Sequence, residues 1–263
     1  MKTKNLFFAA LAFVLLLSST FSFAQDDKRP MYLSVTTMYW NGDNAMSMDD
    51  WKAGEKEYMD KVTSKNEYIM WGGYFTHLLT PNSNEVVYGQ SYPNWEAMEK
   101  AAARSAELEK AAWPDKAVRE AFLKKMNSAY SDFHRDEIYA TLPGIKALNG
   151  ELPDGAILYI RENKRAYPDS RPEGELSGFM KRTLENVINK NDYIKGYYPS
   201  QHNWGSDRRD FIQAFYLNSL GDLDKMFTKN TELMKAAFTE DEAKAMGKYF
   251  KGHGDYIYSV IKL

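Results

Sequence analysis

One pentapeptide occurs twice in this chain, and its repetition decides the fold. The first copy is KNEYI at Lys65–Ile69, and the second is KNDYI at Lys190–Ile194, which begins 125 residues later. The same offset carries His77 onto His202. Self-similarity at a fixed separation predicts a duplicated structural unit.

A second pair of matching segments closes each copy. The segment HRDEIY begins at His134, and HGDYIY begins at His253, at an offset of 119 residues. The chain has four histidines, and all of them fall in the two matched pairs. A tandem duplication explains two such pairs, in the same order, better than chance does. A glycine-tyrosine pair also follows each pentapeptide, and its tyrosines are Tyr74 and Tyr197.

The same order of elements is predicted for both halves. Runs rich in β-branched and aromatic residues predict strands, whereas capping residues and apolar residues at three- and four-residue spacing predict helices. Each half is therefore a βαββαβ unit of the ferredoxin-like kind, and the protein is an α+β protein. The expected strands are 31–39, 68–79, 85–92 and 136–142, then 156–163, 193–204, 210–217 and 255–261. The expected helices are 47–65, 94–112 and 114–131, then 175–189 and two that begin at 219 and 239.

Two ferredoxin-like units in one chain resemble the dimeric α+β barrel superfamily in its tandem, single-chain form. That group includes NIPSNAP-type proteins, antibiotic-biosynthesis monooxygenases and proteins similar to chlorite dismutases. The resemblance covers residues 30–263 and rests on element order, duplication and length, without a subfamily motif. It implies two repeats packed as a pseudo-dimeric α+β barrel. For activity it implies either an oxygenase without a cofactor or a haem protein.

The first 24 residues predict a secretory signal peptide. Lys2 and Lys4 precede an apolar run over 6–17, and a small-x-small site ends at Ala24. The alternative is a membrane anchor, but the apolar run is shorter than the roughly 20 residues that cross a bilayer. We therefore expect an exported chain, periplasmic or extracellular, with no membrane contact after cleavage. The expected domains are a signal peptide at 1–24, repeats at 25–143 and 155–263, and a linker at 144–154.

Composition excludes several classes of protein. The whole chain has 34 Lys+Arg, 36 Asp+Glu and no cysteine, so disulfide scaffolds and cysteine chemistry are excluded. Removal of residues 1–24 takes two lysines and no acid, which leaves 32 basic against 36 acidic residues and a net charge of -4. A nucleic-acid partner is therefore not expected. The motifs of common nucleotide-binding, protease, hydrolase and calcium sites are absent.

The histidines are the first candidates for a site. In a ferredoxin-like sheet with strand order 4-1-3-2, His77 and His134 lie on opposite edges, roughly 14 Å apart at about 4.8 Å per strand. One repeat alone cannot bring both to a metal, because Zn–N contacts are about 2 Å. If the two sheets packed together, His77 could meet His253. His134 could likewise meet His202. The alternative is that all four are ordinary hydrogen-bonded residues inherited from the ancestral unit.

A carboxylate accompanies each closing histidine. His134 and Asp136 are two residues apart on a predicted strand and face the same side, as do His253 and Asp255. A carboxylate beside an imidazole raises its basicity, as in a general base or behind a haem ligand. The alternative is a pair that caps a strand entry or meets solvent. No metal site is predicted.

Aromatic residues suggest a ligand. After residue 24 the chain keeps 9 Phe, 18 Tyr and 6 Trp, a composition that suits a cavity, although core packing also uses it. The sequence thus predicts an exported module, monomer or homodimer, that binds a small apolar or aromatic molecule in a cleft between the repeats without turnover. The alternative is an oxygenase-like or haem-dependent enzyme that uses His202 or His253. The candidate ligand-binding residues are His77, His134, His202, His253, Asp136, Asp255, Tyr74 and Tyr197.

Overall fold

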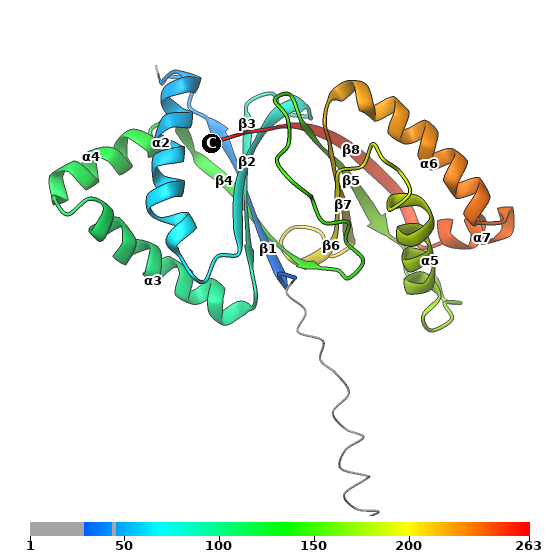
Figure 1. Cartoon of the computed structure of the whole chain (residues 1–263). Coiled ribbons are helices and arrows are strands. Elements are labelled where there is room, and N and C mark those ends of the chain that lie inside the picture. The colour runs from blue at the N-terminus through cyan, green and yellow to red at the C-terminus, as the bar shows by residue number, and fades with distance from the viewer. Residues whose placement is uncertain (1–28, 44–45) are drawn as a thin grey trace, which may run out of the picture.

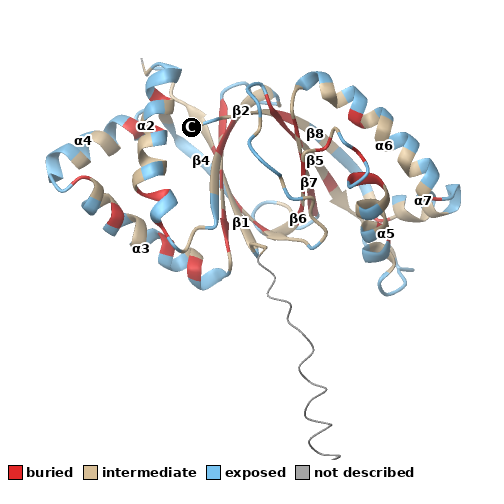
Figure 2. Ribbon diagram, viewed as in Figure 1, coloured by how far each residue is buried: buried red, intermediate tan, exposed pale blue. Residues whose placement is uncertain are grey.

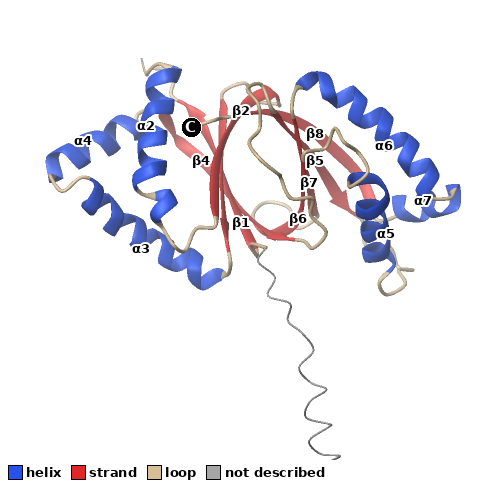
Figure 3. Ribbon diagram, viewed as in Figure 1, coloured by secondary structure: helices blue, strands red, loops and turns tan. Residues whose placement is uncertain are grey.

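Eight strands form a closed barrel in the centre of the molecule, with helices on two opposite sides of it (Figures 1 and 3). The computed structural model describes residues 29–43 and 46–263. The predicted signal peptide lies outside the described residues. Within the described residues, no helix is long and apolar enough to cross a membrane.

Each repeat contributes four strands and the helices on its own side of the barrel. The strands of the first repeat are β1 (Tyr32–Trp40), β2 (Trp71–Leu79), β3 (Glu85–Tyr92) and β4 (Tyr130–Thr141), and its helices are α2 (Met48–Lys61), α3 (Trp95–Ala112) and α4 (Lys116–Asn127). The strands of the second repeat are β5 (Ile157–Arg165), β6 (Gly196–Trp204), β7 (Asp210–Leu217) and β8 (Phe250–Val260), and its helices are α5 (Glu175–Thr183), α6 (Leu223–Ala237) and α7 (Glu240–Gly247). Short turns of helix follow α2 at Thr63–Lys65 and precede α6 at Leu220–Asp222, and a π-helical turn follows α5 at Leu184–Ile188.

The strand order confirms two tandem ferredoxin-like repeats. Around the barrel the order is β1-β3-β2-β8-β5-β7-β6-β4, so each repeat has the predicted 4-1-3-2 arrangement. The repeats join edge to edge, because β2 pairs with β8 and β4 pairs with β6, both antiparallel. Closure in this way leaves no free sheet edge. The pseudo-dimeric α+β barrel is therefore confirmed.

Four strands begin three or more residues away from the expected position. β2 begins at Trp71 rather than Tyr68, because the chain first makes a turn that the Ile69 amide closes on the Asn66 carbonyl at 3.0 Å. β6 begins at Gly196 rather than Tyr193, after a turn that the Ile194 amide closes on the Asn191 carbonyl at 3.2 Å. β4 begins at Tyr130 rather than Asp136, and β8 begins at Phe250 rather than Asp255. The early parts of β4 and β8 are polar and mostly exposed. Their sequence therefore lacks the apolar alternation that predicts a strand.

The repeated asparagines make the same contacts in both repeats. The Asn66 amide donates to the Ala101 carbonyl of α3 at 2.9 Å. The Asn191 amide donates to the Met226 carbonyl of α6 at 3.0 Å. Each side-chain oxygen also accepts from the backbone amide of the tyrosine two residues later, at 3.1 Å. Both side chains are almost fully buried, so the pentapeptide is retained because it fastens the turn before the second strand to the second helix.

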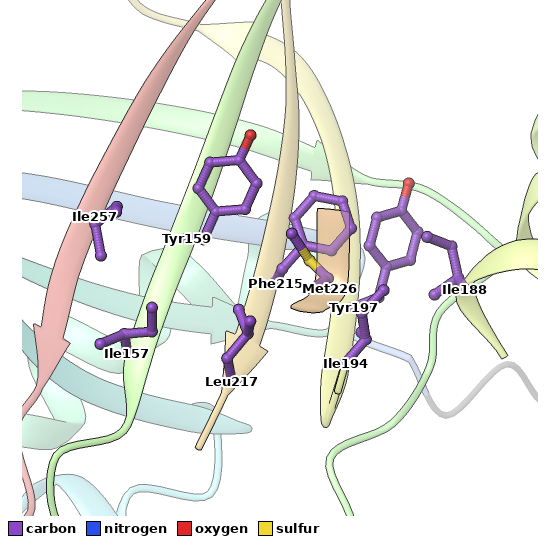
Figure 4. Packing of buried hydrophobic residues seen from close by; sticks show 9 residues of the cluster. All are labelled: Ile157, Tyr159, Ile188, Ile194, Tyr197, Phe215, Leu217, Met226 and Ile257. Carbon is purple, nitrogen blue, oxygen red and sulfur yellow. The ribbon is translucent and has the colours of Figure 1, made fainter. Parts of the chain in front are cut away.

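Each sheet packs its outer face against its helices, and buried residues lie along this contact (Figure 2). Figure 4 shows one such cluster in the second repeat, where aliphatic side chains and the rings of Tyr159, Tyr197 and Phe215 lie over β5–β8. Met226 of α6 closes this cluster and is fully buried. These close-packed side chains support the strands that lie beside helix α5.

Candidate ligand cavity

A cavity of about 820 Å³ opens beside this core, between helix α5 and strands β6 and β7. This volume is within the range of small-molecule sites. Its floor includes the buried residues Tyr197, Phe211 and Tyr249, and α5 supplies Leu176 and Met180. Residues 142–144, which follow β4, and residues of the segment 165–174, which leads from the end of β5 to α5, complete the wall. We call this space the α5 cavity.

The corresponding space in the first repeat is filled. Trp51 of α2 is 1% exposed and lies with its ring edge-on to Tyr74, at 5.4 Å between centroids. Its indole nitrogen donates to the Tyr130 hydroxyl at 2.7 Å. The Tyr74 and Tyr130 hydroxyls in turn donate to the Glu55 carboxylate at 2.6 and 2.9 Å. Burial raises the Glu55 pKa, and the two tyrosine hydrogen bonds oppose that rise.

Strand register explains why the second repeat is hollow. Tyr74 of β2 is opposite Tyr88 of β3, and their rings stack at 4.4 Å. The residues at the same places in β6 and β7 are Pro199 and Gln213. Neither carries a ring of comparable reach, and Leu176 and Met180 of α5 occupy less space than an indole. The loss of bulk on both sides leaves the α5 cavity open.

Polar groups at the cavity floor are fixed by neighbours. The Gln213 amide donates to the Tyr197 hydroxyl at 2.9 Å, and burial raises the pKa of Tyr197 to about 12. Tyr249 donates to the Glu175 carboxylate, which also pairs with Lys248 at 2.7 Å. These tyrosines therefore present neutral rings to the cavity at physiological pH.

Two arginines flank one exposed ring at the cavity wall. The Arg165 guanidinium donates to the Gln201 side chain at 2.8 Å and lies 5.9 Å from the centroid of the Tyr167 ring. The Arg171 guanidinium lies 6.0 Å from the same centroid. All four of these residues line the cavity. This part of the wall is thus positively charged.

The sequence-predicted site residues divide among several places. Tyr197 lines the α5 cavity, whereas Tyr74 is packed in the first repeat. His77 and Asp255 line a shallower hollow of about 360 Å³ beyond the end of β2. The Nδ1 atom of His77 is hydrogen-bonded to the Thr80 hydroxyl at 2.8 Å. The α5 cavity therefore lies on the outer face of the second repeat, and a ligand cleft between the repeats stays a prediction.

The predicted histidine–aspartate pairs form, but they lie on the surface. His134 Nε2 is 3.2 Å from Asp136, and His253 Nε2 is 3.1 Å from Asp255. Both histidine side chains are about half exposed, at 56% and 43%. Asp136 also accepts from the Thr36 hydroxyl at 2.6 Å. Neither histidine lines the α5 cavity.

The predicted meeting of histidines across the repeats is wrong. His77 is opposite Tyr258 in the β2–β8 pair, five residues from His253. His202 is opposite Tyr139 in the β4–β6 pair, again five residues from His134. Five residues span about 17 Å along a strand at about 3.4 Å each. The edges meet as expected, but the register separates the imidazoles, and the described residues contain no group of three or more ligands that suits a metal ion.

The fold of this chain is similar to that of several solved structures. The chain superposes on a candidate monooxygenase from Fusobacterium nucleatum with a TM-score of 0.57 at 10% identity, over 89% of this chain and 94% of that one. A candidate monooxygenase from Lactobacillus acidophilus gives 0.56 at 7% identity over the same shares. A mutant chlorite dismutase from Candidatus Nitrospira defluvii gives 0.53 at 10% identity, over 89% and 93%.

These similarities establish the α+β barrel fold alone. No family model matches the sequence, and no curated protein does. The fold is therefore that of the superfamily that the element order resembles, and the chemistry has to be argued from this chain's own residues.

Haem, the cofactor that the resemblance implies, does not fit the α5 cavity through a histidine ligand. His202 lies in β6, and His253 lies in β8 beside Asn163 of β5. No histidine is among the residues that line the cavity. The haem hypothesis requires an imidazole to bind the iron, and the α5 cavity supplies none.

Sequence reasoning missed most of the residues that form the cavity. Arg165, Arg171, Leu176, Met180 and Pro199 were not candidates. One signal was available, because the connection after β5 contains PDSRPEG at residues 168–174 and has no counterpart in the first repeat. Two prolines within five residues indicate an irregular segment rather than a helix or strand.

Proposed function

We propose that this protein is exported and binds a small, mainly apolar molecule in the α5 cavity without turning it over. The observation that carries the proposal is the contrast between the repeats. At the same place in one fold, the first repeat buries Trp51 and Tyr74, whereas the second repeat has an open space over buried aromatic side chains. A partly open, mainly apolar hollow over buried aromatic side chains favours a ligand site, because small-molecule sites are concave and largely apolar.

The helix beside the cavity supports the proposal. After α5 the chain makes a π-helical turn at Leu184–Ile188, whereas the first repeat has a 3₁₀ turn at Thr63–Lys65. The π-turn presents Leu184 to the cavity, and π-turns within helices are frequent at functional sites. Part of the cavity wall is thus formed by a π-helical turn, whereas the first repeat has a 3₁₀ turn after its helix α2.

Fluorescence of N-phenyl-1-naphthylamine tests the proposal directly. This neutral aromatic probe brightens in apolar surroundings, and we expect saturable binding to residues 25–263 in a ratio of one per chain. Leu176→Trp puts an indole on the cavity side of α5 and is expected to abolish the signal. Leu220→Trp adds the same side chain at an exposed position away from the cavity, and it should leave binding unchanged.

Two outcomes would overturn this assignment. Absence of saturable binding to the unmodified chain, both by this probe and by its anionic analogue 8-anilinonaphthalene-1-sulfonate, would remove the ligand-binding function. Equal binding by the Leu176→Trp and Leu220→Trp variants would place the probe somewhere else. Mass spectrometry of the probe after overnight incubation, in air and at neutral pH, should recover it unchanged, whereas an oxygenated product would favour the oxygenase alternative.

Export is tested separately. In a bacterial host that expresses the full chain, the signal peptide predicts a periplasmic or secreted product whose N-terminal residue is Gln25. Recovery of a product that retains residues 1–24 in the membrane fraction would instead support the anchor.

A further inference from the structure

We infer that the ligand of the α5 cavity is a small organic acid, with an apolar body on the cavity floor and one anionic group held by Arg165 and Arg171. This inference rests on the proposed function and adds the chemical class of the ligand. It is carried by the placement of two arginines that have no acidic partner.

Arg165 is held in place but not neutralised. It ends β5, is half-buried, and its guanidinium donates to Gln201 of β6 at 2.8 Å. An amide oxygen is a neutral acceptor, so this contact orients the guanidinium and leaves its charge uncompensated. A guanidinium has five N–H donors, and the contact with Gln201 uses one nitrogen.

Arg171 brings a second positive charge to the same wall. Its guanidinium and that of Arg165 lie about equally far from the centroid of the Tyr167 ring, at 6.0 and 5.9 Å. Both residues line the same cavity, with Arg165 half-buried and Arg171 exposed. An anionic group bound at this wall would be attracted by both charges. Bidentate recognition of carboxylate is the chemistry that a guanidinium fork suits best.

Other arginines of the described chain show what a structural role looks like. Arg104, Arg161, Arg182 and Arg209 each lie within 3.1 Å of a carboxylate oxygen. In the described residues, neither Arg165 nor Arg171 has a carboxylate at ion-pair distance. Arg119 and Arg208 also have no carboxylate at ion-pair distance in the described residues, but unlike Arg165 and Arg171 they do not line the cavity.

The remaining charges at the cavity do not supply the missing partner. Glu185 is 3.9 Å from Lys181 on the same helix turn, and Glu175, next to the cavity, is engaged by Lys248 at 2.7 Å. Glu173 lines the cavity but is exposed and makes no ion pair with either arginine in the described residues. The lining thus has three basic and two acidic side chains, with its excess charge positive.

The apolar part of the cavity defines the rest of the ligand. Phe211 and Tyr197 are nearly fully buried at the floor, and Met180 faces them from α5. A flat or branched hydrocarbon body fits against these side chains, and its acidic group would reach the arginines at the wall. Neither a fully polar anion nor a neutral hydrocarbon would use both parts of the site.

A matched pair of probes tests the inference. 8-Anilinonaphthalene-1-sulfonate has the ring skeleton of N-phenyl-1-naphthylamine plus one sulfonate. We expect the unmodified chain to bind the anionic probe at least about tenfold more tightly, a difference of about 1.4 kcal/mol. Arg165→Gln and Arg171→Gln should each weaken the anionic probe about tenfold and change the neutral probe less than twofold. Arg104→Gln, a matched surface change in the first repeat, should affect neither.

Each outcome decides a different question. Equal affinity of the unmodified chain for the two probes would overturn the inference that the ligand is an organic acid. So would a loss of affinity for the anionic probe in Arg104→Gln as large as in the cavity variants. Either result would leave the ligand-binding function intact. Loss of both probes in an arginine variant would show that the arginine shapes the cavity rather than binds the anion, which also overturns the inference. If the unmodified chain bound neither probe, the proposed ligand-binding function would be overturned, and with it the inference that the ligand is an organic acid.

Discussion

Between helix α2 and its sheet, Trp51 is buried with two tyrosines and a glutamate; between helix α5 and its sheet there is a cavity. The two places are related by the duplication, since β2 and β6 have the same pairing register at an offset of 125 residues. What differs is side-chain volume, not topology. A duplicated fold can thus keep one copy as a packed support and leave the other free for a ligand.

The largest effect is expected where the first repeat is filled. Trp51→Ala would remove a fully buried indole and leave the Tyr130 hydroxyl without its donor, at a cost of about 3–5 kcal/mol in the free energy of unfolding. Leu176→Ala, on the cavity side of α5, should cost less than about 1.5 kcal/mol because it enlarges a space that already exists. Urea denaturation of both variants measures the contrast.

Similar decreases in the free energy of unfolding of Trp51→Ala and Leu176→Ala would contradict the expected difference between the repeats. If Trp51→Ala does not fold, Trp51→Phe keeps most of the volume and still loses the hydrogen bond. It should then be less stable than the unmodified chain, and Leu176→Ala should again be the milder change.

The second effect concerns what the repeats share. Asn66→Ala and Asn191→Ala each remove a buried amide that ties a turn to a helix, so each should lower the free energy of unfolding by about 2–3 kcal/mol. The two losses should agree within about 1 kcal/mol, because the partners are equivalent. Chemical denaturation checks this equality, and a loss in only one repeat would show that the shared motif has different roles.

These equivalences explain how far the sequence could be read. The pentapeptides and the histidine matches predicted the duplication, and with it the element order and the 4-1-3-2 arrangement of strands. They could not predict the register between the repeats, which depends on how two sheet edges meet, and the hypothesis that the histidines meet across the repeats was therefore wrong. The cavity was hidden for a different reason: it results from residues such as Pro199 and Gln213 that are unlike their counterparts, whereas a search for repeats finds residues that are alike.

A third effect is the part of the pH dependence of stability that Glu55 of the first repeat causes. Burial raises the Glu55 pKa, so the folded chain binds this proton more tightly than the unfolded chain does. The resulting stability is fully present below the unfolded pKa and is lost as the pH rises through the folded pKa. Glu55→Gln cannot titrate, so its free energy of unfolding should fall less than that of the unmodified chain as the pH rises from 4 to 8. Met180→Gln on α5 is the matched control.

A steeper fall in the Glu55→Gln variant would contradict this assignment. The comparison should be made by urea denaturation at fixed ionic strength, so that screening of the surface ion pairs stays the same throughout. Because the control variant keeps Glu55, its slope should match that of the unmodified chain.

The smallest effect concerns the surface histidines. His134→Ala and His253→Ala each remove an exposed pair with an aspartate, and such pairs contribute little because water and salt screen them. Each variant should change the free energy of unfolding by less than about 0.5 kcal/mol and leave the binding of both naphthalene probes unchanged. A tenfold loss of probe binding in His253→Ala alone would bring this histidine back as a site residue, even though it does not line the cavity. Unchanged binding in both variants would mean that the most visible repeat of the sequence records common descent, and that the ligand is recognised where the two repeats diverged.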